Sequence, residues 1–364
     1  QEPQSGKFRK LSFLAGVQGT ESPGVPPSSA RKASMKKRIL LLSTGGTIAS
    51  VSSEHGLQPG QTGNDLLSVL GALPYDVTVR DILRLDSTNI QPEEWQYIAE
   101  CAYTMREGFA GVVITHGTDT MAYTASMLTF MLSGIDLPVV LTGSQLPVSN
   151  PLSDAPYNLR CAFEMAVSGV PGVFIAFDRK ILLGCRSVKV RTTGFNAFES
   201  VKAPVVAEVN SDGLCFGESL PPRTSVHCTL KKDIDSRVVL IKLIPGMDPN
   251  LFRALKSMGC RGVVIEAFGS GGLNFIRRDL ISAMGELVRG NIPVVVCSQC
   301  LYERSDLTKY EVGQRALEEG VIPGEDMTSE CAATKLMWAL GQGMDTAQIA
   351  AFFQTSVAGE VTIR

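Results

Sequence analysis

Short apolar runs alternate with longer amphipathic stretches along most of the chain, beginning near Met35. Five mostly apolar runs in the first half have the length of strands, at residues 38–42, 76–85, 111–115, 138–142 and 173–177. Helical spacing of apolar residues predicts helices between them, at residues 64–73, 92–107, 119–132 and 159–167. Strands buried on both faces and separated by amphipathic helices are typical of a parallel sheet with helices on both sides. The pattern therefore predicts an α/β fold.

The alternation stops once and then resumes. Residues 181–215 are more polar and resemble short strands and turns, and residues 217–235 contain two adjacent prolines and few apolar positions, which indicates a linker. Beyond it, strands are predicted at residues 238–243, 263–267 and 293–297, and helices at residues 249–258, 278–289, 310–319 and 330–340. We expect a disordered leader or a remnant of cloning at residues 1–34, an N-terminal domain at 35–216, a linker at 217–236 and a C-terminal domain at 237–364.

Charge and cysteine content limit the possible partners and compartment. Residues 1–38 carry eight Lys or Arg and two Glu, so the remainder, with 26 basic and 34 acidic residues, has a net charge of −8. A body of that sign repels phosphate backbones, and we expect no nucleic-acid partner. Nine scattered cysteines fit a reducing cytoplasm better than a secreted disulfide framework. The longest uncharged runs, residues 120–135 and 137–153, are too short and polar to span a membrane.

The first residues leave one alternative for localisation. Residues 11–17 form a very short apolar run after three basic residues, which weakly resembles a signal peptide. A polar stretch rich in Pro, Ser and Gly follows it. We favour a leader before a natural start at Met35, and hence a cytoplasmic protein.

Two loops at predicted strand ends carry the most chemistry, because ligands of parallel sheets sit beyond the carboxyl ends of strands. The first is Ser-Thr-Gly-Gly-Thr-Ile-Ala-Ser at residues 43–50, where paired glycines let the backbone approach a ligand and leave the Thr47 hydroxyl clear as a nucleophile. A plain tight turn explains it equally well, and no Lys follows the glycines as in a phosphate loop. The second loop, residues 115–120, places Thr118 where a helix is predicted to begin, so that its N–H can face an oxyanion.

Three further positions are candidates with simpler explanations beside them. Asp119 can bind a substrate ammonium or complement the helix dipole. Lys189 can accept a proton from a Thr only when it is neutral, whereas an isolated Lys is usually a solvated surface charge. Ser87, with Thr88, is suited to hold a carboxylate, although capping of the helix predicted near Pro92 is the simpler interpretation.

Two other arrangements do not support a competing chemistry. Cys297 and Cys300 form a Cys-x-x-Cys pair without a second pair of ligands for zinc, and we interpret them as structural thiols. The three histidines lie far apart in sequence and no Gly-x-Ser-x-Gly elbow is present, which argues against a His-based hydrolase.

Taken together, the loops resemble those of the bacterial-type L-asparaginase family, in its cytoplasmic, type I-like branch. Thr-Gly-Gly-Thr-Ile-Ala at residues 44–49 is followed by His-Gly-Thr-Asp-Thr-Met at 116–121, and the likeness extends from about Lys37 to the C-terminus. Its other parts are residues 85–88, 122–128, 154–160, Lys189 and 323–328.

The resemblance implies a larger N-terminal α/β domain with a mixed, mostly parallel sheet and a smaller flavodoxin-like C-terminal domain. It implies a homodimer or homotetramer in which each active site lies between domains of two subunits. By position, Thr47 matches the family's nucleophile, Thr118, Asp119 and Lys189 match its second catalytic set, and Ser87 with Thr88 matches the substrate-carboxylate loop. The implied reaction is hydrolysis of L-asparagine to L-aspartate and ammonia through an acyl-threonine, without metal or organic cofactor. No residue of the sequence determines the ratio of activity on L-asparagine to activity on L-glutamine.

One departure from the family concerns activation of the nucleophile. Many members carry a Tyr on the mobile loop after it, where this chain has Leu57. Either Tyr302 or His55 takes over, or Thr118 and Lys189 serve more of the reaction. Two other functions therefore stay open: an ammonia-releasing subunit of a tRNA-dependent amidotransferase, and a non-catalytic amino-acid sensor.

Overall fold

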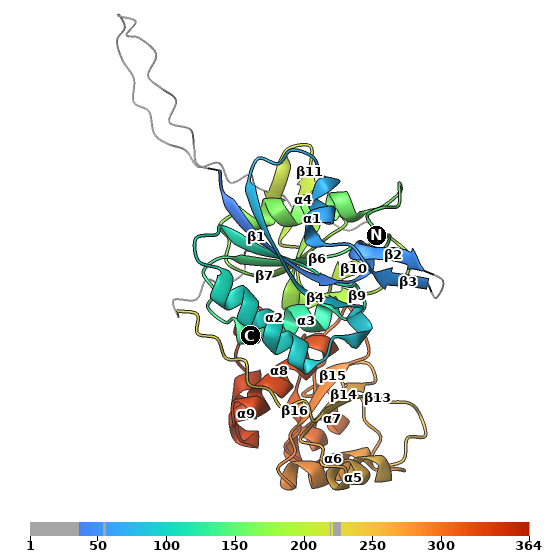
Figure 1. The fold of residues 1–364 in the computed structure, drawn as a ribbon. Helices are drawn as coiled ribbons and strands as arrows, with labels where there is room; N and C mark the ends of the chain where they lie inside the picture. The colour runs from blue at the N-terminus through green and yellow to red at the C-terminus, as the bar shows by residue number, and fades with distance from the viewer. Residues whose placement is uncertain (1–35, 54–55, 219, 221–226, 364) are drawn as a thin grey trace, which may run out of the picture.

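The main sheet of the protein has eight strands and carries the loops of interest (Figure 1). The computed structural model describes residues 36–53, 56–218, 220 and 227–363. The strand order is β12-β11-β8-β7-β6-β5-β1-β4, in which β4, β1, β5, β6 and β7 run parallel and the remaining neighbours pair antiparallel. The strands are β1 (Arg38–Gly45), β4 (Asp76–Leu85), β5 (Gly111–Thr115), β6 (Pro138–Thr142), β7 (Gly172–Phe177), β8 (Lys180–Leu183), β11 (Ala207–Asn210) and β12 (Gly213–Phe216). The predicted mixed, mostly parallel sheet is confirmed.

Helices cover both faces of this sheet, as its doubly apolar strands require. In Figure 1, α1 (Gly63–Ser68) and α4 (Ala155–Ala166) lie on one side, and α2 (Pro92–Met105) and α3 (Met121–Met131) on the other, toward the smaller sheet. Short turns of 3-10 helix lie at Thr47–Ala49, Ser87–Asn89 and Gly184–Arg186. Two small antiparallel pairs complete this part: β2 (Ser50–Ser53) with β3 (Gly56–Pro59), and β9 (Ser187–Lys189) with β10 (Phe198–Ser200).

The second sheet is smaller and entirely parallel. Its order is β13 (Val238–Lys242), β14 (Gly262–Ala267), β15 (Val294–Ser298) and β16 (Ile322–Pro323). Side chains of β14 alternate between two cores: Val263 and Ile265 pack with α5 (Asn250–Ser257), α6 (Leu280–Arg289) and α7 (Glu311–Glu318), whereas Val264 packs with α8 (Ser329–Gly341) and α9 (Thr346–Phe353). This is the smaller α/β unit that the resemblance implied.

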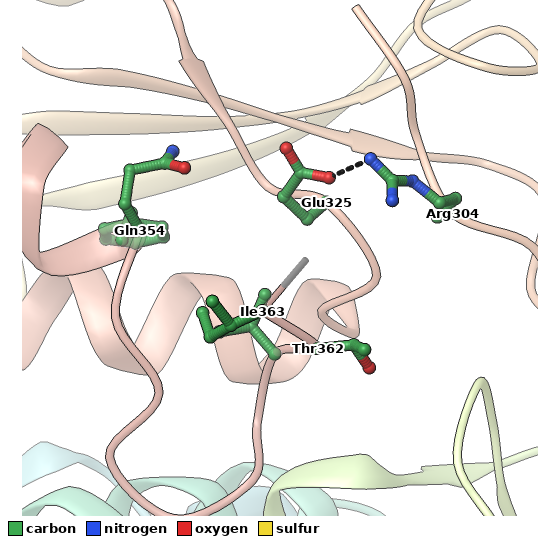
Figure 2. Close-up of a pocket in the computed structure, with 7 residues that line it drawn as sticks. Arg304, Glu325, Gln354, Thr362 and Ile363 are labelled. Atoms are coloured by element: carbon green, nitrogen blue, oxygen red, sulfur yellow. Dashed lines mark hydrogen bonds and ion pairs between the residues drawn. The ribbon is translucent and has the colours of Figure 1, made fainter.

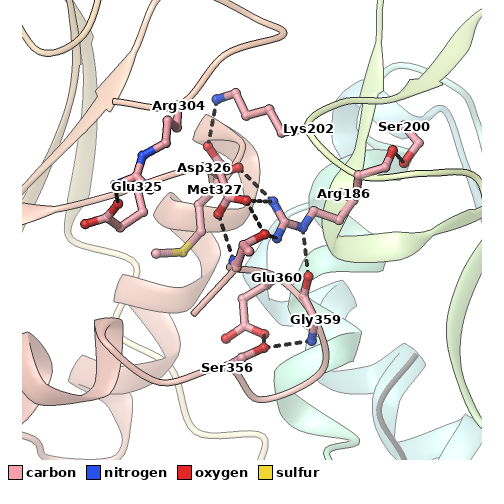
Figure 3. Close-up of polar contacts among 12 residues, drawn as sticks. Arg186, Ser200, Lys202, Arg304, Glu325, Asp326, Met327, Ser356, Gly359 and Glu360 are labelled. Carbon is pink, nitrogen blue, oxygen red and sulfur yellow. Dashed lines mark hydrogen bonds and ion pairs between the residues drawn. The ribbon is translucent and has the colours of Figure 1, made fainter. Parts of the chain in front are cut away.

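Helix α8 and one arginine join the two sheets. Cys331 and Trp338 of α8 belong to the core of the large sheet, and the Trp338 and Phe130 rings lie 6.2 Å apart. Figure 3 shows the buried Arg186 reaching across to the C-terminal part. Its guanidinium lies 3.1 Å from the Asp326 carboxylate and donates to the Asp326 carbonyl at 2.8 Å and the Gly359 carbonyl at 2.7 Å.

The predicted elements differ from the structure mainly at their ends. The helix predicted at 64–73 ends at Ser68, and the one predicted at 159–167 begins earlier, at Ala155, with a proline in its first turn. Helix α9 and the β2–β3 pair correspond to no predicted element. The predicted leader at 1–34, the candidate His55 and part of the predicted linker lie outside the described residues. Within the described part of the chain, none of the helices has the length and apolar character needed to cross a membrane.

Candidate active site

The loops after β1 and β5 meet backbone to backbone at two glycines. Gly46, at φ 80°, donates its N–H to the Leu85 carbonyl at 2.9 Å, and a Cβ added to it would lie 2.4 Å from the Gly117 nitrogen. The Thr44 hydroxyl also donates to the Thr115 carbonyl at 2.7 Å. Only glycine allows this approach, because any side chain would fill the space that the facing backbone occupies. Two segments remote in sequence, each bearing a candidate threonine, are thereby held together.

Thr47 follows this contact directly, as the first residue of its 3-10 turn. The turn is anchored by the fully buried Ile48 and Ala49, and the Ile48 carbonyl accepts the Val148 N–H at 3.2 Å. Thr47 itself is half-buried, and none of the described residues hydrogen bonds to its hydroxyl. The Thr47 backbone is thus held in place while its hydroxyl stays available to a substrate; a nucleophile of this kind also needs a base to take its proton.

Thr118, Asp119 and Lys189 form one polar cluster. Lys189 reaches from β9, and its Nζ donates to the Thr118 hydroxyl oxygen at 2.8 Å and to Asp119 Oδ1 at 2.5 Å. The Lys189 side chain is only 16% exposed, so it is not a solvated surface charge, while the Asp119 side chain is 56% exposed. Asp119 does not cap α3, whose N-cap is Thr120. The helix begins at Met121 rather than at 119 as predicted, so Thr118 stands in the approach to the helix and not in its first turn.

Ser87 lies against this cluster from the loop after β4. It is buried, its hydroxyl oxygen accepts the Asp119 N–H at 3.2 Å, and its carbonyl accepts the Thr120 hydroxyl at 2.7 Å. Thr88 is exposed, and its hydroxyl donates to Asp86, which also accepts the Thr88 N–H. Asp86 therefore caps this turn, and the Ser87 hydroxyl keeps its proton for another acceptor.

His116 is a structural residue of the second loop. The Gly117 carbonyl can only accept, so His116 Nδ1 carries the proton that reaches it at 2.7 Å. Nε2 of the neutral ring therefore accepts from the Thr124 hydroxyl at 2.9 Å, whose oxygen accepts the Trp95 N–H at 3.0 Å. Complete burial lowers the pKa of His116 to about 4, despite the Gly117 bond that favours its protonation. The neutral ring holds the loop and has no free nitrogen for catalysis.

The other candidates lie apart from this cluster. Tyr302 donates its hydroxyl proton to Glu199 on β10 at 2.6 Å and makes no hydrogen bond to Thr47. Leu57 lies in β3. Cys297 is buried, Cys300 is exposed and both are free thiols; burial raises the pKa of Cys297 to about 12. Among the described residues no group of His, Cys, Asp and Glu is arranged as metal ligands.

A cavity in the C-terminal part is separate from these residues. Figure 2 shows it, with Arg304 and Glu325 ion-paired above the chain end. Its volume is about 250 Å³, and none of the predicted site residues lines it.

One residue beside the cluster was not predicted. Gln145, in the loop after β6, lies with its side-chain oxygen 3.4 Å from the Thr118 hydroxyl. The position of this loop at a parallel strand end is the only sequence signal that points to it.

The chain is similar to known proteins over most of its length. A family model described as "Asparaginase, N-terminal" matches residues 38–221, and one described as "Glutaminase/Asparaginase C-terminal domain" matches residues 237–353. An L-asparaginase of Thermococcus kodakarensis is 44% identical over 89% of this chain and 99% of its own length. A subunit of the glutamyl-tRNA(Gln) amidotransferase of Methanothermobacter thermautotrophicus is 35% identical over 93% of this chain and 80% of its own length.

Solved structures give the same result. The thermostable L-asparaginase from Thermococcus kodakarensis superposes with a TM-score of 0.86, at 44% identity, over 90% of this chain and all of that one. A probable cytoplasmic L-asparaginase from Campylobacter jejuni superposes with a TM-score of 0.74, at 26% identity, over 88% of this chain and all of that one.

Proposed function

This chain belongs to the asparaginase family, and on that premise we propose that it hydrolyses L-asparagine to L-aspartate and ammonia through an acyl-threonine. The observation that carries the proposal is the meeting of two hydroxyl-bearing loops at Gly46 and Gly117. Beside that contact stand the Thr47 hydroxyl, to which none of the described residues hydrogen bonds, and the Thr118–Asp119–Lys189 cluster.

Substrate binding follows from the charges of the site. The α-carboxylate binds at the Ser87 hydroxyl, with Thr88 beside it, because no other described residue accepts the Ser87 proton. The substrate ammonium binds at Asp119, since its exposed carboxylate keeps the oxygen that Lys189 does not use. These two contacts place the side-chain amide between the loops.

In the first step, the Thr47 hydroxyl oxygen bonds to the amide carbon, the carbon–nitrogen bond breaks, and the proton that Thr47 loses ends on the leaving nitrogen to give ammonia. N–H groups near Thr118 stabilise the oxyanion, with about 3 kcal/mol for each well-placed donor. In the second step, water held at Thr118 and Lys189 adds to the ester, and Thr47 leaves with a proton. Division of amide cleavage into two acyl transfers is the purpose of such a nucleophile.

We further propose a cytoplasmic homodimer or homotetramer with the boundaries 35–216 and 237–364 for its two domains. The likeness to the probable cytoplasmic enzyme of Campylobacter jejuni and the exposure of Asp119 in the single chain support these points. Size-exclusion chromatography with light scattering tests the oligomeric state.

The test of the reaction is ammonia release from L-asparagine, D-asparagine and L-glutamine. We expect turnover of L-asparagine that Thr47→Ala and Thr118→Ala abolish, while Thr129→Ala, a buried threonine elsewhere on α3, retains it. Full activity of the Thr47→Ala protein would overturn the assignment of the nucleophile. Calorimetric binding of asparagine without turnover would instead select an amino-acid sensor.

The likeness to the amidotransferase subunit supports a second candidate. An ammonia-releasing subunit would be active only with its partner subunit and glutamyl-tRNA. Steady ammonia release by the isolated protein, unchanged when tRNA is added, excludes that candidate.

A further inference from the structure

Gln145 links the loop of Thr118 to the hairpin of Lys189. Its side-chain Nε2 donates to the Gly194 carbonyl at 3.1 Å, in the turn between β9 and β10, and its Oε1 lies 3.4 Å from the Thr118 hydroxyl. One amide therefore contacts both Thr118 and the turn of the hairpin that carries Lys189.

The orientation of this amide follows from its partners. The Gly194 carbonyl can only accept a hydrogen bond, so the Gln145 nitrogen must face it. The oxygen of the same amide is thereby directed to Thr118 and can only accept. A glutamine held in this way presents a fixed acceptor to the hydroxyl.

This acceptor decides where the Thr118 proton points. A hydroxyl has one proton to donate and two lone pairs, and Lys189 donates to one of those lone pairs. With the proton directed to Gln145, the second lone pair is left to accept from a water molecule. The 3.4 Å separation is long, as catalytic hydrogen bonds often are before substrate binds.

A further pair of residues holds Gln145 in place. The Asp154 carboxylate accepts the Gln145 N–H at 3.0 Å and the Leu146 N–H at 3.2 Å. Asn158, one turn along α4, donates to Asp154 at 3.0 Å and to the Gly143 carbonyl at 2.9 Å. Residues 154–160, a segment of the family resemblance with no catalytic group of its own, are thereby explained as the support of this loop.

We propose that Gln145 is a positioning residue for hydrolysis of the acyl-threonine, an inference that rests on the proposed function. Its oxygen directs the Thr118 proton away from the site, so that the attacking water donates to Thr118 and aims its own lone pair at the ester carbon. The water oxygen bonds to that carbon, the bond to the Thr47 oxygen breaks, and a proton ends on Thr47. Without Gln145, the Thr118 proton turns to the water, so that the water no longer donates to Thr118 and loses the contact that aims it at the ester carbon.

The test is steady-state and first-turnover kinetics of the full chain with L-asparagine. In Gln145→Met we expect kcat to fall roughly tenfold, KM to fall with it, and kcat/KM to stay within about twofold of the parent. Ammonia should appear in a burst in the first turnover, because acylation is intact. Hydroxylamine, a stronger nucleophile than water, should raise the turnover of the variant more than that of the parent.

Two variants complete the design. Gln145→Asn keeps a polar amide but is one methylene too short to reach Thr118, so we expect the same kinetic change as in Gln145→Met. This variant keeps the inference testable if Gln145→Met does not fold. Gln96→Met removes another half-buried glutamine, which donates to the Lys232 carbonyl at 2.9 Å, and should leave both constants unchanged.

The outcomes are distinct. An equal fall of kcat/KM and kcat without a burst would show that Gln145 is merely structural. An unchanged kcat would show that Gln145 has no role in turnover. Either result overturns this inference and leaves the proposed function standing. A parent protein that releases no ammonia from L-asparagine overturns the proposed function and this inference with it.

Discussion

The glycine contact between the Thr47 loop and the Thr118 loop allows a sharp test of how closely the two loops must approach. The change is Gly46→Ala. Its Cβ would lie 2.4 Å from the Gly117 nitrogen, 2.5 Å from the Gly117 Cα and 2.9 Å from the His116 carbonyl carbon. All three are main-chain atoms, so no side-chain rotation relieves the overlap.

The magnitude has two parts. Gly46 has φ 80° and ψ −179°, a combination that essentially only glycine adopts, so a side chain there costs about 1–3 kcal/mol. The overlap adds about 1–3 kcal/mol, as overpacking does elsewhere, so the free energy of unfolding should fall by about 2–6 kcal/mol. Ordinary contact distances require the loops to separate by about 1 Å. A displacement of that size in a catalytic arrangement costs on the order of 100-fold in kcat/KM.

The matched control is Gly71→Ala. Gly71 has a similar φ of 67°, but nothing lies within 4 Å of its added Cβ. Gly71→Ala should lower the free energy of unfolding only by the cost of a side chain at positive φ, and it should leave the activity unchanged. The two variants are compared by urea unfolding and ammonia release, and equal losses in both assays would refute the idea that the close approach of the loops matters.

Three further predictions concern stability and catalysis. Arg186→Met should lower the free energy of unfolding by about 3–5 kcal/mol, because it breaks a buried ion pair with Asp326. The control Arg253→Met breaks an exposed ion pair and should cost less than about 1 kcal/mol. Equal costs of the two changes in urea unfolding would contradict this reasoning. His116 has a pKa near 4 in the folded protein and 6.5 in the unfolded chain, so unfolding takes up a proton between those two pH values. The free energy of unfolding should therefore fall by roughly 3 kcal/mol as the pH drops from 6.5 to 4. An identical dependence on pH in His116→Gln would disprove the contribution of His116 to this loss. Lys189→Met should reduce ammonia release at least 100-fold with the thermal unfolding temperature little changed, and retained activity would remove Lys189 from the mechanism.

Sequence pattern predicted the strands better than the helix ends. The strands at 111–115 and 138–142 were predicted to the residue, because apolar runs bounded by glycine, proline or polar loops have clear limits. The start of α4 was predicted too late, since Asp154 and Pro156 open the helix before its apolar face begins. The β2–β3 pair has no apolar alternation to reveal it.

For the site, residue types could be predicted but contacts could not. Lys189 by itself is an ordinary lysine; its contacts with Thr118 and Asp119 are evident only once the β9–β10 pair is formed. For Gln145 the sequence shows only a place after a parallel strand, because its orientation depends on the Gly194 carbonyl. Contacts of this kind arise from how separate loops meet and not from local pattern.

Helix α8 has a consequence for how the chain is made. Trp338 and Cys331 complete the hydrophobic core beneath the large sheet, against the almost wholly buried α3. During synthesis the ribosome releases the last strand of that sheet long before it releases this helix. The nascent N-terminal half must therefore expose the apolar surface of α3 until α8 has been made, and for that interval the exposed surface is prone to aggregation.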